Sequence, residues 1–221
     1  MQRGTAVDAV RIPDGKEWLD GDLQIPAGAR GLVIFAHGSG SSRFSTRNRQ
    51  VSDFLNTGGF ATLLLDLLTP AEERIDVRTA EYRFDIPLLG RRVVAATDWA
   101  SAHEGLQQLP VGYFGASTGA AAALMAAAER PTVAAVVSRG GRPDLAGEAL
   151  ARVRAPTLLI VGGSDEPVIE LNQAAIRYMR GSVELAVVPH ATHLFEERGA
   201  LDEVQKLALE WFTRFINPRR G

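Results

Sequence analysis

Short apolar runs alternate with longer amphipathic stretches along this chain. The runs are rich in valine, isoleucine and leucine and have the length of buried strands. They cover residues 7–12, 18–25, 32–36, 60–68, 111–114, 133–137, 157–161 and 183–188. The first two runs are joined by the turn signal Pro13-Asp14-Gly15, which predicts an antiparallel pair at one edge of a sheet.

The stretches between these runs have the periodicity of helices covering a sheet. Helices are predicted over residues 48–56, 91–103, 118–130, 144–153, 168–180 and 201–216. Continuous apolar strands separated by helices favour a mostly parallel sheet that is covered on both faces. We therefore expect one α/β domain over residues 1–221. Residues 69–90 lack a clear pattern, so we expect a long functional loop there, with Glu72 and Glu73 exposed.

Composition excludes several classes of function. The 221 residues are 46% apolar and 23% charged, as expected for a globular domain, and the net charge of −2 gives no basis for binding nucleic acid or an anionic membrane. The absence of cysteine excludes disulfides, thiolate metal sites and a cysteine nucleophile. No apolar run has the length of a membrane span, and the first residues do not form a secretory signal. A cytoplasmic protein is the default expectation.

The most specific motif is Gly115-Ala116-Ser117-Thr118-Gly119, which lies between an apolar run and an alanine-rich stretch. Strand, Gly-x-Ser-x-Gly and helix in this order are typical of a nucleophile elbow. Small residues beside the serine let strand and helix approach closely, and the sharp turn exposes the hydroxyl. Ser117 is therefore the predicted nucleophile.

A serine nucleophile needs a base to take its proton and an acid to orient that base. Asp165 follows the apolar run 157–161 and is the predicted acid, although a helix N-cap would also explain it. Glu166 and Asp144 are the alternatives. His193 is the predicted base because it lies deeper in the loop after residues 183–188 and precedes an apolar pair, whereas His190 is expected at the surface or in a supporting role.

The tetrahedral intermediate needs two hydrogen-bond donors for its oxyanion. The backbone N–H of Thr118, the residue after the nucleophile, is the first. The loop His37-Gly38-Ser39-Gly40 follows the run 32–36, and we assign the second donor to the Ser39 N–H. A phosphate-binding loop is the competing interpretation, but no Gly-Lys-Ser/Thr follows. His37, Gly38 and Arg139 are candidates for lining the substrate pocket, with His37 ordering the loop.

These motifs resemble the dienelactone hydrolase-like branch of the α/β-hydrolase superfamily over nearly the whole chain. The matching segments are residues 37–40, 65–70, 115–119, 162–165 and 190–195. Residues 138–145 resemble hydrolase domains found fused to phosphoribosyltransferases, and we expect no such second domain here. The resemblance implies an eight-stranded α/β-hydrolase core with little cap, and it supports Ser117, Asp165 and His193 as the triad.

The resemblance has one departure: dienelactone hydrolases proper use a cysteine nucleophile, and serine-bearing relatives look like carboxylesterases. We therefore expect a carboxylesterase without cofactor or metal that acts on small or short-chain esters. Thioesterase, amidase or lactone hydrolase activity on the same triad is the alternative, and a non-catalytic binding protein is the alternative from another class. The sequence leaves the substrate and the oligomeric state open.

Overall fold

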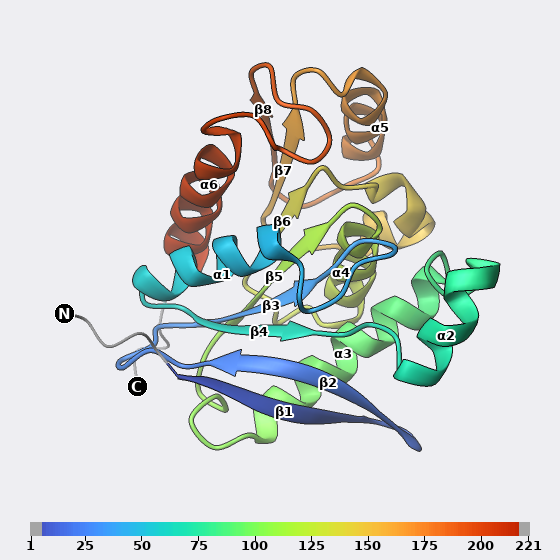
Figure 1. The fold of residues 1–221 in the computed structure, drawn as a ribbon. Coiled ribbons are helices and arrows are strands. Elements are labelled where there is room, and N and C mark those ends of the chain that lie inside the picture. The colour runs from blue at the N-terminus through green and yellow to red at the C-terminus, as the bar shows by residue number, and fades with distance from the viewer. Residues whose placement is uncertain (1–5, 217–221) are drawn as a thin grey trace.

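The computed structural model describes residues 6–216, which form a sheet of eight strands with helices on both faces (Figure 1). The strands are β1 (Val7–Asp14), β2 (Glu17–Gln24), β3 (Leu32–Ala36), β4 (Ala61–Leu65), β5 (Val111–Ala116), β6 (Ala135–Arg139), β7 (Thr157–Gly162) and β8 (Val183–Val188). Their order in the sheet is β1-β2-β4-β3-β5-β6-β7-β8. The pairs β1–β2 and β2–β4 are antiparallel and the other pairs are parallel. The predicted fold class and antiparallel edge are confirmed.

Two layers of helices enclose the sheet. One face carries α1 (Thr46–Thr57) and α6 (Ala200–Phe215), and the other carries α3 (Ile86–Ala102), α4 (Thr118–Glu129), the 3₁₀ helix η1 (Pro143–Arg152) and α5 (Glu166–Ile176). All five residues of β3 are buried because both of its faces are covered. Val33 and Phe35 pack towards α1 and α6, whereas Leu32 and Ile34 pack towards α3 and α4.

The region expected to be a long loop is mostly helical. It contains α2 (Pro70–Thr79) and the first residues of α3, which begins at Ile86 after its N-cap Asp85. Thr69 and Glu72 form a reciprocal capping box at the start of α2. α2 has no apolar stripe because Asp76 is its only buried residue, so hydrophobic periodicity could not reveal this helix.

Two other elements differ from expectation. β4 ends at Leu65 instead of residue 68, because the backbone N–H of Leu67 leaves the sheet and donates to the His37 imidazole. The segment before β7 is a 3₁₀ helix interrupted at Gly147, whose φ of 53° an ordinary helix cannot contain. Among residues 6–216, no helix is long and apolar enough to cross a membrane.

Candidate active site

Ser117 occupies a strained turn at the carboxyl end of β5. Its φ and ψ of 51° and −122° lie outside the regions that L-residues ordinarily adopt, at a cost of about 1–3 kcal/mol. The surrounding backbone holds this conformation. The Ser117 N–H donates to the Arg139 carbonyl at 3.2 Å, and the Ser117 carbonyl accepts from the N–H groups of Ala120 and Arg142, both at 3.1 Å. This is the backbone geometry that a nucleophile elbow requires.

The two glycines of the motif are required by close packing around this turn. A β-carbon on Gly115 would collide with the backbone of Ala120 in α4. A β-carbon on Gly119 would collide with the carbonyl of Ala36 at the end of β3. The motif therefore brings β5, α4 and β3 together around Ser117.

Asp165 and His193 are in direct contact. Nδ1 of His193 lies 2.7 Å from Oδ2 of Asp165, although 28 residues separate the two in sequence. Asp165 is at the N-cap position of α5, but its side chain makes no capping hydrogen bond. The helix-cap interpretation therefore does not explain this carboxylate. With Nδ1–H donating to Asp165, Nε2 of His193 is left as the proton acceptor.

The loop that carries His193 is fixed by buried apolar neighbours. Ala191 and Phe195 are fully buried, whereas Leu194 is 42% exposed, so only Phe195 of the expected apolar pair anchors the loop. A β-carbon on Gly140 would lie 3.6 Å from Cε1 of His193, which places the imidazole against the turn after β6. The turn after β6 directly follows Arg139, whose carbonyl accepts a hydrogen bond from the Ser117 N–H. Within residues 6–216 no hydrogen bond joins Ser117 Oγ to His193, and such contacts are often loose before substrate binds.

The alternative acids and base lie in different settings. Both carboxylate oxygens of Asp144 accept from the Arg142 guanidinium, at 2.9 and 2.7 Å. Glu166 is exposed in the first turn of α5. His190 is exposed with a φ of 62°. The structure brings none of these three residues into hydrogen-bond contact with His193.

The glycine-rich loop after β3 packs directly against the elbow. The Ser39 N–H donates to Oγ1 of Thr118 at 2.8 Å. The Thr118 N–H is the first of α4 and has no acceptor within the helix. Ser39 and Thr118 line a small hollow together with His37, Gly38, Gly40, Ser41, Leu67, Leu68, Glu73, Arg83 and Leu89.

His37 fixes the orientation of this loop. Its Nε2 accepts from the Leu67 N–H at 3.0 Å, so its Nδ1–H donates to the Gly38 carbonyl at 2.9 Å. Burial lowers the pKa of His37, which keeps the imidazole neutral and able to accept through Nε2. Because the Gly38 carbonyl is held on one side of its peptide, the Ser39 N–H is directed to the other side, towards Thr118.

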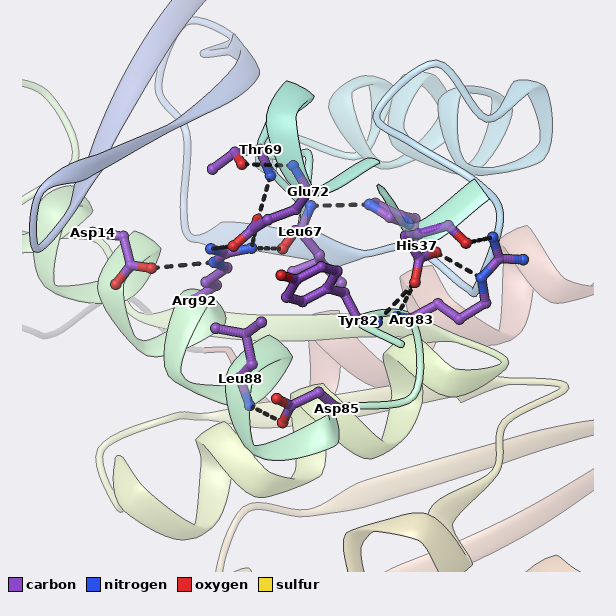
Figure 2. Close-up of polar contacts among 11 residues, drawn as sticks. Asp14, His37, Leu67, Thr69, Glu72, Tyr82, Arg83, Asp85, Leu88 and Arg92 are labelled. Atoms are coloured by element: carbon purple, nitrogen blue, oxygen red, sulfur yellow. Dashed lines mark hydrogen bonds and ion pairs between the residues drawn. The ribbon is translucent and has the colours of Figure 1, made fainter. Parts of the chain in front are cut away.

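The buried Arg92 holds Leu67, the residue that donates to His37, in place through a hydrogen bond, as Figure 2 shows. The Arg92 guanidinium donates to the Leu67 carbonyl at 2.6 Å, to both Glu72 oxygens at 2.6 and 2.7 Å, and to Asp14 at 3.1 Å. Burial opposes the charge of Arg92, but the two carboxylates raise its pKa overall. Burial likewise opposes the charge of Glu72, whose pKa is nevertheless lowered by Arg92 and by the Thr69 N–H. The expectation that Glu72 and Glu73 are exposed was wrong, because both are partly buried.

Sequence reasoning did not find Arg92. Its partners lie 20, 25 and 78 residues away in the chain, so no local pattern marks it. The available signal was the sequence Thr69-Pro70-x-Glu72, which has the form of a capping box and would have predicted α2.

Arg139 was expected to line the substrate pocket, but its side chain is buried against Asn48. Its Nη2 donates to Asn48 Oδ1 at 3.1 Å, and its Nη1 is buried without a partner among the described residues. Burial and the nearby charge of Arg47 lower the pKa of Arg139 to about 10. Arg139 does not line the hollow beside Ser39, whereas His37 and Gly38 do.

Two solved structures are similar to this chain over nearly its whole length. A dienelactone hydrolase from Anabaena variabilis is 57% identical, with 97% of this chain and 100% of that chain covered and a TM-score of 0.95. Est1E from Butyrivibrio proteoclasticus is 19% identical, covers 93% of this chain and 98% of its own, and has a TM-score of 0.76, which shows the shared α/β-hydrolase fold.

The curated relatives are longer proteins. A Mycobacterium tuberculosis protein, provisionally named phosphoribosyl transferase and present in two strains, is 56% identical over 206 residues. These residues are 93% of this chain but 46% of the relative, so the chain spans about half the length of the curated relatives it matches. Residues 19–217 match the family model described as Dienelactone hydrolase family. With this match over most of its length, the chain belongs to the dienelactone hydrolase family.

Proposed function

We propose that this protein is a serine carboxylesterase that hydrolyses small or short-chain carboxylic esters through an acyl-enzyme. The observation that carries the proposal is the 2.7 Å contact between Asp165 and His193 beside the strained Ser117 turn. A partly buried carboxylate that orients an imidazole next to a serine hydroxyl is the arrangement that activates serine as a nucleophile. The family is that of hydrolases, and the Gly-x-Ser-x-Gly motif supplies the serine.

The proposed reaction has two stages. Ser117 Oγ bonds to the ester carbonyl carbon while its proton passes to Nε2 of His193, and the carbonyl oxygen becomes an oxyanion. The C–O bond to the alcohol then breaks, and His193 gives its proton to the departing alkoxide. Water attacks the acyl-enzyme in the same way, with His193 as base, and the carboxylic acid and free Ser117 result. Asp165 stabilises the imidazolium in both stages.

The segments that surround Ser117 limit the size of the substrate. Beyond the sheet and its two helix layers, the described residues provide only α2 and connecting loops near the catalytic edge of the sheet. The hollow beside Ser39 is small and is flanked by Leu68 and Leu89. These features favour short acyl groups over long fatty chains.

Lactone hydrolysis is the second candidate, and one observation favours it. The Anabaena variabilis protein that is 57% identical over 97% of this chain is named a dienelactone hydrolase. A lactone is a cyclic ester, so the same triad would open it and keep the alcohol attached to the acyl group. Thioesters and amides are further substrates that this triad would serve. The phosphoribosyl transferase name belongs to proteins of about twice the matched length, and nothing in the Ser117 site favours that chemistry.

A panel of p-nitrophenyl esters of increasing acyl length, acyl-thioesters and lactones tests this proposal. We expect the highest kcat/KM on short esters or lactones and none with Ser117→Ala. Turnover that is equal in the wild type and in Ser117→Ala would contradict the proposed nucleophile. The absence of turnover on every member of the panel would favour a non-catalytic binding protein.

A further inference from the structure

The side chain of Thr118 lies at the contact between α4 and the glycine-rich loop after β3. Thr118 is buried, is the first residue of α4, and lines the small hollow together with Gly38 and Ser39. A β-carbon on Gly38 would lie 3.0 Å from Cβ of Ser117, so this loop directly contacts the nucleophile. The Thr118 backbone follows Ser117 immediately. Its hydroxyl therefore lies beside the loop that contacts Ser117.

The hydrogen bonds of this threonine leave one proton unassigned. The Ser39 N–H, expected to serve the oxyanion directly, already has an acceptor in Oγ1 of Thr118 at 2.8 Å. A hydroxyl carries one donor proton in addition to its lone pairs. Among the hydrogen bonds of residues 6–216, Oγ1 of Thr118 takes part only as this acceptor. Its own proton therefore has no acceptor among these residues.

We propose that the Thr118 hydroxyl donates a hydrogen bond to the oxyanion, with the Ser39 N–H acting behind it. Thr118 would then contribute two donors, its backbone N–H and its side-chain O–H. This inference rests on the proposed ester hydrolysis at Ser117. It makes the Thr118 side chain a catalytic residue and makes Ser39 a positioning residue.

A hydroxyl that accepts one hydrogen bond becomes a better donor in a second. The Ser39 N–H draws electron density from Oγ1, and the two hydrogen bonds strengthen each other in a site with little water. An O–H donor to an oxyanion forms a charge-assisted bond, which is about twice as strong as a neutral one. The benefit appears only when negative charge develops, so it lowers the barrier and does not tighten substrate binding.

The Ser39 N–H is held in place by a chain of contacts that starts in the core. Arg92 binds the Leu67 carbonyl, the Leu67 N–H binds His37, and His37 binds the Gly38 carbonyl. These bonds fix the peptide whose N–H meets Thr118. The hydroxyl is therefore presented at one orientation before substrate arrives, which is the condition for electrostatic stabilisation of a transition state.

The same contact has an opposite interpretation. The Thr118 hydroxyl would block the Ser39 N–H and would have to rotate away before the oxyanion binds. Under that interpretation the hydroxyl hinders catalysis, and its removal increases the rate. The two interpretations predict effects of opposite sign on kcat, so one substitution separates them.

The test compares Thr118→Val, which keeps the shape but removes the hydroxyl, with Thr118→Ser, which keeps the hydroxyl. We expect Thr118→Val to lower kcat about 10²-fold with little change in KM, because one oxyanion donor is lost. Thr118→Ser should recover most of the rate. Affinity for a trifluoromethyl ketone, which forms a tetrahedral adduct with Ser117, should fall in parallel with kcat/KM.

Thr157→Val is the matched control. Thr157 is fully buried at the start of β7, and its hydroxyl makes one hydrogen bond, to the Ala155 carbonyl at 3.0 Å. It should lose stability but keep the wild-type kcat. An unchanged or increased kcat in folded Thr118→Val would overturn the inference while leaving the esterase proposal intact. A wild-type protein that hydrolyses no ester and is not acylated at Ser117 would instead mean that the proposed function has failed.

Discussion

Helix α3 contributes one residue to each of two arginine–carboxylate pairs, and the two pairs differ in their surroundings. At the catalytic edge of the sheet, Arg92 is 2% exposed and binds Glu72, Asp14 and the Leu67 carbonyl. At the opposite edge, Arg130 is 33% exposed. It binds Asp98 of α3 through two hydrogen bonds at 2.9 and 2.6 Å and the Glu129 carbonyl at 3.3 Å. The chemistry of the two pairs is the same, but burial differs.

The difference in burial changes how much each ion pair contributes to stability and whether it connects to the Ser117 site. An exposed ion pair contributes about 0–1 kcal/mol, because water solvates both partners nearly as well. A buried pair cannot lose one partner without leaving an uncompensated charge. The buried pair also continues through Leu67 and His37 to the loop beside Ser117. Polar groups at the catalytic edge should therefore affect both activity and stability, and those at the opposite edge should affect neither strongly.

The largest contrast should come from the same substitution at the two edges. Asp165→Asn should lower kcat about 10⁴-fold, because the amide no longer fixes the His193 tautomer or stabilises its positive charge. Asp98→Asn should leave kcat at the wild-type value. Steady-state kinetics on a short p-nitrophenyl ester measures both. If Asp165→Asn kept more than a tenth of the wild-type kcat, Asp165 would not be the triad acid, and Asp144→Asn would be the next variant to measure.

The next contrast concerns stability. Arg92→Met should lower the free energy of unfolding by about 3–5 kcal/mol, because Glu72 and Asp14 are left without their counter-charge. Arg130→Met should cost about 0–1 kcal/mol. Urea unfolding followed by circular dichroism measures both values.

The Arg92 substitution should also reach the catalytic site, because it removes the donor to the Leu67 carbonyl. In protein that remains folded, kcat should fall while KM stays close to its original value. Equal losses of stability in Arg92→Met and Arg130→Met would mean that burial does not distinguish the two pairs.

The smallest contrast is in the pH dependence of stability. Arg92 and Thr69 hold the pKa of Glu72 below its unfolded value, so the unfolded carboxyl binds protons more readily as acid is added. The contribution of Glu72 is therefore complete above its unfolded pKa of about 4.3 and is lost as the pH falls through its lower folded pKa. Glu72→Gln should be less stable at pH 7 and should lose less stability than the wild type between about pH 5 and pH 3. If the free energy of unfolding changed with pH equally in the wild type and in Glu72→Gln, Glu72 would not be the source of this pH dependence.

The sequence predicted most of the sheet, because the strands depend on local patterns. Apolar runs marked the strands, and the elbow motif marked Ser117. The contact between Asp165 and His193 was inferred because residues that follow parallel strands meet at one edge of the sheet.

The features that were missed depend on contacts between distant segments. α2 buries a carboxylate instead of an apolar stripe, and Arg92 joins residues from β1, the loop after β4 and the α2 capping box. The bond between the Ser39 N–H and Thr118 Oγ1 spans 79 residues and depends on the orientation of one peptide. Such orientations arise only when the whole sheet is assembled, so no spacing in the sequence encodes them.

The proposed ester hydrolysis requires Ser117 to be an activated nucleophile. Incubation with a fluorophosphonate followed by peptide mapping tests this directly, because the reagent phosphonylates only a serine whose proton is accepted by a neighbouring base. We expect stoichiometric labelling at Ser117, much slower labelling in Asp165→Asn, and none in Ser117→Ala. Labelling of another residue, or a wild-type protein that stays unlabelled while correctly folded, would contradict the proposal.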